Sequence, residues 1–256
     1  MGHTGFQVSA IGLGTVKFGR NSGVNYPRSF ELPSDTEARQ LLDLAKGLGI
    51  NLLDTAPAYG CAEERLGFLL SKDRNDWVIV SKVGEEFSDG QSRFDFTPEY
   101  TRLSVERSLA RLRCDCIDVV LVHSNGEDLA ILHHYGTLEA LAELKQRGLV
   151  GSYGISIKTL EGGLQAAATC DVLMVTYNPA HRIEEPVLKA CHEHSTGVLI
   201  KKALSSGHLD STEQDPVQAS MNLSLRHCAT SSVIVGTLSS DHLRSNVIAA
   251  HNALTT

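Results

Sequence analysis

The sequence contains no long hydrophobic run and no leader pattern. None of its apolar stretches approaches the roughly 18 to 20 residues that a membrane helix requires. The first residues, MGHTGFQVSAIG, do not show the basic and then apolar order of a signal peptide. The six cysteines are scattered and form no Cys-x-x-Cys pair, which argues against a disulfide framework or a zinc knuckle. These absences predict a cytoplasmic protein without a membrane partner.

Basic charge is also scarce. The chain has 23 Lys and Arg against 30 Asp and Glu, so its formal net charge is -7 at pH 7 with neutral histidines. This balance argues against nucleic acid as a partner, because a nucleic-acid surface needs a dominant basic face. The histidines at 133, 134, 192 and 194 do not stand at the ends of several expected strands, so we predict no metal site.

Short apolar runs alternate with longer amphipathic segments along the chain, and no linker-like or low-complexity stretch divides them. Eight runs are expected to form strands: 10–15, 51–54, 77–83, 116–123, 150–156, 172–177, 197–202 and 232–236. Eight helices are expected to begin near Ser34, Cys61, Pro98, Gly136, Thr159, Ile183, Asp215 and Ser240. Several of these starts carry residues that favour helix caps.

The expected strands are apolar on both faces, which is typical of a parallel sheet covered by helices. Eight βα units in 256 residues predict an α/β fold, a single (β/α)8 TIM barrel with parallel strands that forms one domain over residues 1–256. An open doubly wound sheet is the alternative, but the glycine-rich segment GLGTVKFG lacks the G-x-G-x-x-G spacing. The segment 84–97 is expected to be a loop.

Four polar residues follow neighbouring strands of the expected barrel, at the end where barrel active sites lie. Asp54, Lys82 and His123 stand at or near the ends of the second, third and fourth strands, and Tyr59 follows the second. A lysine after the apolar run WVIVS needs a counter-charge, which Asp54 can supply. An ammonium near Tyr59 is expected to lower the pKa of its phenol and to allow proton exchange with a substrate oxygen. As structural alternatives, His123 forms a fixed hydrogen bond and Asp54 caps a turn.

The segments that carry these residues are LLDTAPAYGCAEERLG, VIVSKVG and DVVLVHS, and they resemble the aldo-keto reductases. The resemblance extends from VSAIGLGT to VIVGTLSSDHLRSNV. It implies that Asp54, Tyr59, Lys82 and His123 are the catalytic residues. It also implies hydride transfer between NAD(P)H and a carbonyl or alcohol substrate, with Tyr59 as general acid or base, the Asp54–Lys82 pair tuning it and His123 orienting the carbonyl oxygen.

The resemblance also implies where the dinucleotide binds. Its phosphates are expected at the loops after the last two strands, where backbone amides and hydroxyls are available. The resemblance places the carboxamide at Ser156 and the adenine near Asn246. The expected cofactor-binding residues are Gly14, Thr15, Val16, Asp54, Ser156, Lys202, Leu204, Ser205, Ser206, Gly207, Gly236, Thr237, Ser239, His242 and Asn246.

Some positions depart from the family pattern. Ile157 stands where an Asn often follows the serine, and Met174 stands where a Gln is expected. An aromatic residue of the seventh strand often stacks on the nicotinamide, whereas this chain has Lys201 and Lys202 there. We expect these two lysines to face a helix or a phosphate.

Cofactor preference is read from the loop after the last strand. Gly236 and His242 stand at the positions where NADP(H)-preferring relatives commonly carry a Lys or Arg, and Arg244 is close by. A guanidinium pairs well with a phosphate, so the sequence slightly favours NADP(H) over NAD(H).

Two other functions stay open at this point. A barrel of this kind could bind the cofactor as a sensor or auxiliary subunit without turnover, because fold does not fix function. A Schiff-base enzyme of the aldolase type would instead use Lys82 or Lys202 as the nucleophile. The expected partner is a small-molecule carbonyl or alcohol substrate, and the motifs do not indicate an oligomeric state.

Overall fold

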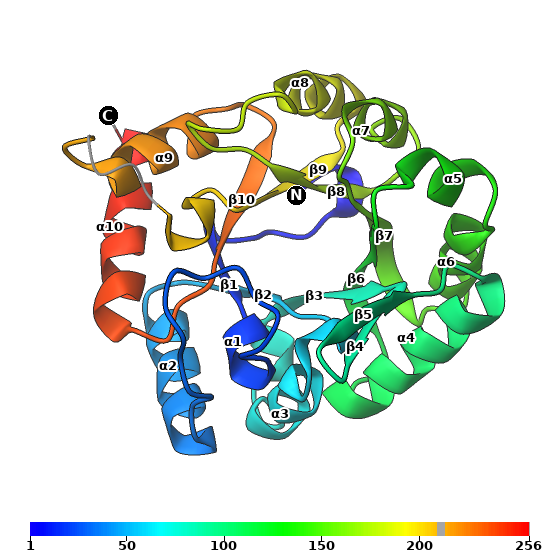
Figure 1. The fold of residues 1–256 in the computed structure, drawn as a ribbon, viewed down its shortest axis with the longest axis horizontal. Coiled ribbons are helices and arrows are strands. Elements are labelled where there is room, and N and C mark those ends of the chain that lie inside the picture. The colour runs from blue at the N-terminus through cyan, green and yellow to red at the C-terminus, as the bar shows by residue number, and fades with distance from the viewer. Residues whose placement is uncertain (209–212, 256) are drawn as a thin grey trace.

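The computed structural model describes residues 1–208 and 213–255. Eight parallel strands close into a barrel in the order β1-β10-β9-β8-β7-β6-β3-β2, with helices around it (Figure 1). They are β1 Ile11–Gly14, β2 Leu52–Asp54, β3 Val78–Val83, β6 Ile117–His123, β7 Val150–Ser156, β8 Val172–Thr176, β9 Gly197–Lys201 and β10 Thr230–Val235. The eight observed strands differ from the predicted ones by at most two residues at either end, which confirms the predicted (β/α)8 TIM barrel.

The helices begin where the sequence supplies caps. Ser34 accepts a hydrogen bond from the Glu37 amide while the Glu37 side chain accepts one from the Ser34 amide, which completes a capping box. Thr97 caps the next long helix ahead of Pro98. The eight expected helices are α2 Asp35–Gly47, α3 Ala62–Leu69, α4 Pro98–Leu112, α6 Thr137–Gln146, α7 Leu160–Ala166, α8 Glu185–His194, α9 Pro216–Leu225 and α10 Ser240–Thr255.

Further short elements were not expected from the sequence. They are α1 Val16–Gly19 and α5 Asp128–His133, with the 3-10 turns η1 Gly2–Thr4, η2 Pro57–Tyr59, η3 Arg74–Asp76 and η4 Ser205–Gly207. Runs of three to six residues are too short to show a helical period, so periodicity alone does not reveal them. Within the described residues, no helix is long and apolar enough to span a bilayer.

The segment 84–97, expected to be a loop, contains an antiparallel hairpin. Strands β4 Glu85–Ser88 and β5 Gln91–Phe94 pair around Asp89 and Gly90, whose φ angles are 52° and 77°. An Asp-Gly pair with two positive φ angles is typical of a tight hairpin turn. The flanking residues are mostly polar, so a search for apolar strands missed the hairpin and only the Asp-Gly signal pointed to it.

The apolar residues form two layers because alternate residues of a strand face opposite sides of the sheet. The larger layer lies between the strands and the helices. The smaller layer fills the inside of the barrel and consists of Leu52, Val80, Val119, Leu121, Val172, Met174 and Leu199. The barrel is therefore a packed core and not a pore, and polar side chains at the carboxyl ends of its strands lie beyond this core.

Candidate active site

The carboxyl ends of adjacent strands bring together the four residues that the sequence singled out. Asp54 ends β2, Lys82 lies near the end of β3, His123 ends β6 and Tyr59 ends η2. The Lys82 side chain is 1% exposed, and its Nζ lies 2.5 Å from Asp54 Oδ1 and 2.9 Å from the Thr55 carbonyl oxygen. The buried ammonium thus has the counter-charge that burial demands.

Tyr59 lies against this ion pair. Its hydroxyl donates to Asp54 Oδ2 at 3.5 Å, and Lys82 Nζ lies 4.8 Å from the centre of its ring. Its ring meets the His123 ring edge to face, with 6.3 Å between centroids. Burial, and then the charge of Asp54 and the nearby Tyr26, raise the pKa of Tyr59 well above its usual value.

This direction corrects the expectation that Lys82 lowers the pKa of Tyr59. The charge of Lys82 is taken up by Asp54 at 2.5 Å, and the phenol points at the other oxygen of the same carboxylate. A carboxylate next to a phenol favours the neutral form of the phenol. Tyr59 therefore holds its proton at neutral pH, as a general acid must.

His123 has a partner that the sequence did not reveal. Its Nδ1 lies 2.6 Å from Glu85 Oε2, in an ion-pair contact that is not aligned as a hydrogen bond. Burial lowers the pKa of His123, and Lys82 and Lys201 lower it further against the opposing effect of Glu85. Burial alone would raise the pKa of Glu85, but its contacts with His123, together with Ser92 and the charge of Arg20, outweigh that effect and lower the pKa to about 2. Glu85 is on β4, in the hairpin that was expected to be a loop.

Lys201 at the end of β9 faces neither a helix nor a phosphate loop, contrary to expectation. Its Nζ donates to Ser156 Oγ at 2.8 Å and to the Ile157 carbonyl oxygen at 2.7 Å, both at the end of β7. Ser156 is in register with His123 on the neighbouring strand. The lysine thus crosses over β8, and its amine lies at the same end of the barrel as the four residues described above.

The loop after β9, where the dinucleotide phosphates were expected, has an unusual backbone. Lys202, Ser205 and Ser206 have φ angles of 56°, 48° and 56°, in the left-handed region that non-glycine residues rarely adopt. Such strain gathers at binding sites. The amides of Ser205 and Gly207 donate to the carbonyls of Lys202 and Leu204. These two amides are therefore not available to phosphate, which corrects the expectation for them and leaves the hydroxyls.

The loop after β10 approaches the first strand, and glycines at their junction leave little room for a side chain. A Cβ on Gly236 would lie 3.0 Å from the Tyr26 hydroxyl, and one on Gly14 would lie 3.2 Å from Ile234 Cγ2. Thr15 donates to the Asp54 carbonyl oxygen through both its amide, at 2.8 Å, and its hydroxyl, at 2.9 Å. These contacts hold the expected cofactor-binding residues Gly14, Thr15 and Val16 next to Asp54, and Gly236 lies on the other side of Gly14.

The remaining expected cofactor residues lie at the start of α10. The Ser239 amide donates to Thr237 Oγ1 at 3.0 Å, and Ser239 Oγ accepts from the His242 amide at 3.2 Å, so this serine caps the helix. Asn246 is 6% exposed, and Arg244 is exposed one turn from the helix start. Glycines that a Cβ would crowd, a strained serine loop after β9 and a capped helix N-terminus after β10 fit a dinucleotide phosphate site.

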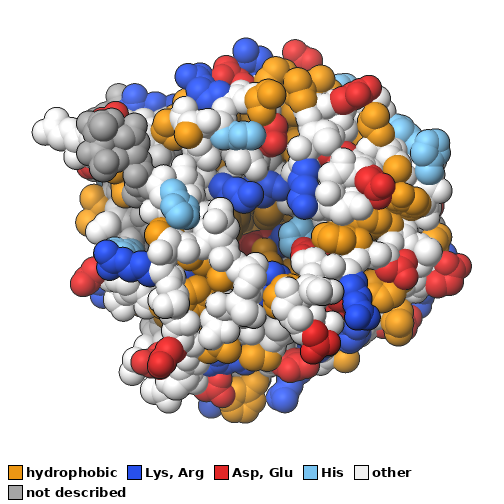
Figure 2. Space-filling view, viewed as in Figure 1, with side chains coloured by type: hydrophobic (Ala, Val, Ile, Leu, Met, Phe, Trp, Pro, Cys, Tyr) orange, Lys and Arg blue, Asp and Glu red, His pale blue; other side chains and the backbone are white. Residues whose placement is uncertain are grey.

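The surface around the site is hollowed. Figure 2 shows a hollow near the middle of the viewed face, over the barrel strands, with basic side chains and a histidine at its edge. No group of three or more His, Cys, Asp or Glu side chains in residues 1–208 and 213–255 is arranged to hold a metal ion. The groups that meet at the carboxyl end of the barrel are a phenol, an imidazole, amines and the carboxylates of Asp54 and Glu85.

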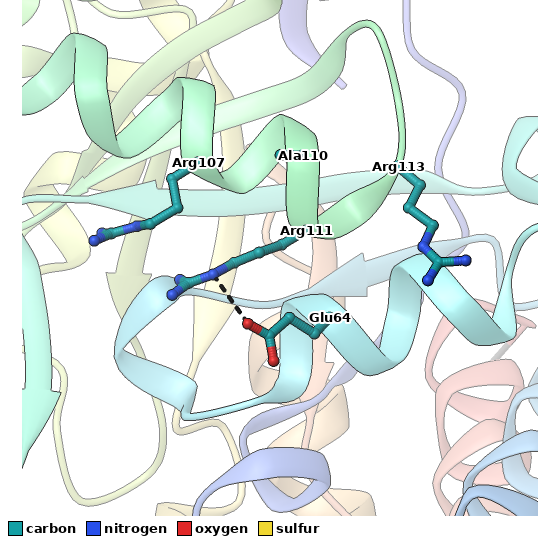
Figure 3. Close-up of a pocket in the computed structure, with 5 residues that line it drawn as sticks. All are labelled: Glu64, Arg107, Ala110, Arg111 and Arg113. Atoms are coloured by element: carbon teal, nitrogen blue, oxygen red, sulfur yellow. Dashed lines mark ion pairs between the residues drawn. The ribbon is translucent and has the colours of Figure 1, made fainter.

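A second hollow lies between α3 and α4, away from the strand ends (Figure 3). Its volume is about 310 Å³, and it is lined by Glu64, Arg107, Ala110, Arg111 and Arg113. Arg111 Nε lies 3.4 Å from Glu64 Oε1, and Arg107 is ion-paired with Glu86. Because carboxylates already compensate two of its three arginines, this pocket is a weak site for an anion.

Comparison with known proteins places the chain among the carbonyl oxidoreductases. Residues 10–230 match the sequence profile of the Aldo/keto reductase family. "Uncharacterized oxidoreductase YqkF" of Bacillus subtilis is 28% identical over 228 residues, which cover 86% of this chain and 69% of that protein. D-threo-aldose 1-dehydrogenase of Pseudomonas sp is 29% identical over 240 residues, 82% of this chain and 70% of that protein.

Solved structures of aldo-keto reductases also resemble this chain. A Pseudomonas aeruginosa protein that carries an aldo-keto reductase assignment superimposes with a TM-score of 0.91 at 53% identity, over 99% of this chain and 94% of that one. The holo form of aldo-keto reductase AKR11C1 from Bacillus halodurans superimposes with a TM-score of 0.81 at 27% identity, over 100% of this chain and 90% of that one. The fold and the relatives therefore both indicate an aldo-keto reductase.

Proposed function

This chain belongs to the aldo/keto reductase family and is an oxidoreductase of carbonyl compounds, and on that premise we propose that it reduces an aldehyde or ketone with NAD(P)H. We propose that residues 1–256 act as a single barrel domain. The observation that carries the proposal is the meeting of Asp54, Tyr59, Lys82 and His123 at the carboxyl end of the barrel. The bound nicotinamide supplies the hydride, and the protein positions and polarises the substrate.

Tyr59 would donate the proton that turns the developing alkoxide into an alcohol. Its raised pKa keeps the proton on the phenol at neutral pH, which suits reduction more than oxidation. After each turnover the phenolate would take up a proton from solvent, and the Asp54–Lys82 pair beside it would tune its affinity for that proton, since the Asp54 carboxylate contacts both the phenol and the ammonium.

His123 would orient the substrate at its oxygen. A carboxylate beside Nδ1 favours a proton on that nitrogen, so Nε2 is the nitrogen left for the substrate. Nε2 donates to a carbonyl oxygen when the ring is doubly protonated and accepts from the product alcohol when the ring is neutral. Glu85 would thus position the ring that orients the substrate.

We expect Glu85→Gln to move the titration of His123 to lower pH, because the variant loses the charge that raises the pKa of the histidine. Histidine NMR titration measures this, with His123→Asn identifying the signal. Glu86→Gln is the matched control, because Glu86 lies on the same strand and pairs with Arg107. An unchanged His123 titration in Glu85→Gln would remove Glu85 from this role.

The loops after β9 and β10, where we expect the dinucleotide phosphates, would bind NADP(H) in slight preference to NAD(H). Arg244 is the exposed guanidinium nearest in sequence to the capped start of α10, and guanidinium binds a phosphate as a fork. We expect Arg244→Ala to raise the dissociation constant of NADPH roughly fivefold and that of NADH by less than about twofold. Equilibrium fluorescence titration at one stated ionic strength tests this, and equal effects on both cofactors would exclude Arg244 as the discriminating residue.

Turnover itself is tested with a panel of aldehydes, ketones and aldoses, followed by the loss of nicotinamide absorbance. Aldoses belong in the panel because a Pseudomonas relative is a D-threo-aldose 1-dehydrogenase. Cofactor binding without turnover on any substrate would favour the sensor or auxiliary-subunit alternative. Covalent trapping of substrate by borohydride on Lys82 or Lys202 would favour the Schiff-base alternative.

A further inference from the structure

Lys201 is the group at the barrel mouth that the proposed reaction does not use. Its Nζ bridges Ser156 Oγ and the Ile157 carbonyl oxygen, so the ammonium is fixed by two acceptors at the end of β7. Both acceptors are uncharged. In this it differs from Lys82, whose Nζ lies against the Asp54 carboxylate.

The charge of Lys201 is therefore not cancelled by direct contact. Among the ion pairs of the described residues, none joins Lys201 to a carboxylate, although Glu184 and Asp128 act on it at longer range. Lys158 and Lys202 add further positive charge nearby. A cation held in a partly dry site acts strongly on any charge brought beside it.

We propose that Lys201 makes this site discriminate between the redox states of its cofactor, binding the reduced nicotinamide more tightly than the oxidised one. The inference rests on the proposed function and on the expectation that the carboxamide binds at Ser156, the residue that Lys201 contacts at 2.8 Å. The nicotinamide ring carries a positive charge when oxidised and none when reduced. The same ammonium therefore repels one redox state and leaves the other unaffected.

A preference for the reduced cofactor would favour repeated turnover by a reductase. A site that binds the oxidised cofactor weakly releases it soon after each reductive turnover, and product inhibition by that cofactor is slight. The phosphates of the two redox states carry the same charge, so lysines that face phosphate, as proposed for Lys202, do not discriminate between them. Only a cation beside the ring does so.

The discrimination depends on pH. Burial, with Lys202 and Lys158 opposing the effect of Glu184 and Asp128, lowers the pKa of Lys201 to about 7. The ammonium is present below that pH and is lost as pH rises through it, so the preference for the reduced cofactor declines in the same interval. The charged or titratable groups that act on the Lys201 site are Asp128 of α5, Lys158 before α7, Glu184 before α8, Lys202 after β9 and His123 of β6.

The test is equilibrium binding of NADP⁺ and NADPH, by calorimetry or fluorescence, at pH 6 and pH 8.5 and at constant ionic strength. At pH 6 the ratio of the two dissociation constants, oxidised over reduced, should be roughly tenfold higher in the wild type than in Lys201→Met. At pH 8.5 the two proteins should give similar ratios. Lys201→Arg should keep the high ratio at both pH values, because a guanidinium does not deprotonate.

Lys202→Met is the matched control. Replacing this neighbouring exposed lysine should weaken the binding of both redox states alike and leave the ratio at pH 6 unchanged, because the Lys201 ammonium is present at that pH with or without Lys202. An unchanged ratio in Lys201→Met, with both cofactors still bound, would overturn the inference and leave the proposed function standing. If the wild type bound neither cofactor, the proposed function would fail and the inference with it. Should Lys201→Met fold poorly, a wild-type ratio that does not fall with pH contradicts the inference by itself.

Discussion

Replacing Tyr59 with phenylalanine is expected to lower kcat for carbonyl reduction by roughly a thousandfold, which is the contribution typical of a positioned general acid. The dissociation constant of NADPH should change by less than about twofold, because the phenol acts on the substrate oxygen. The ring of phenylalanine keeps the contact with the His123 ring and the position under the Lys82 ammonium. Only the hydroxyl and its long hydrogen bond to Asp54 are removed, so the loss should appear in kcat with little change in folding.

Tyr26→Phe is the matched control for this experiment. Tyr26 is a second phenol of the same region, and burial, together with the charge of Asp54, raises its pKa to about 12. Its hydroxyl faces Gly236 and lacks the hydrogen bond to Asp54 Oδ2 that Tyr59 makes. Removal of this hydroxyl should leave most of the activity. Steady-state kinetics on one good substrate decides the matter, and Tyr59→Phe retaining more than about a tenth of wild-type kcat would exclude Tyr59 as the proton donor.

The barrel could be predicted because each βα unit carries local sequence signals for its own strand and helix. Runs such as 117–123 are apolar on both faces, and cap residues such as Ser34 and Thr97 mark the helix starts. The residues that form each of these signals lie close together in the sequence. The strands and helices can therefore be predicted without knowledge of long-range contacts. The β4–β5 hairpin carries no such apolar pattern, and it was missed because only its Asp89-Gly90 turn is distinctive.

The meeting of Asp54, Lys82 and His123 could be predicted because strand ends determine it. Asp54, Lys82 and His123 end parallel strands that are neighbours in the barrel, so sequence order alone brings them together. Contacts made by long side chains do not follow from strand order. The position of Glu85 depends on the hairpin, and Lys201 reaches over a whole strand to Ser156. The direction of the pKa shift of Tyr59 depends on its burial and on which charged group lies nearest to the phenol, and only coordinates supply both.

The largest effect on stability is expected from Lys82→Met. The variant leaves the Asp54 side chain, 6% exposed, without the ammonium that now lies 2.5 Å from its carboxylate. Breaking one half of a buried ion pair costs about 3 to 5 kcal/mol of folding free energy, since the remaining charge is desolvated and unpaired. Carbonyl reduction should also be lost almost completely, because Tyr59 then faces an uncompensated carboxylate.

The double variant Asp54→Asn with Lys82→Met separates these two losses. Removing both charges leaves no unpaired ion, so urea unfolding should show that the double variant regains most of the stability that Lys82→Met loses. Activity should not return, because neither a carboxylate nor an ammonium then contacts Tyr59. A double variant less stable than Lys82→Met alone would show that Asp54 stabilises the barrel through contacts other than the ion pair. If the double variant regained activity together with stability, the Asp54–Lys82 pair would have only a structural role.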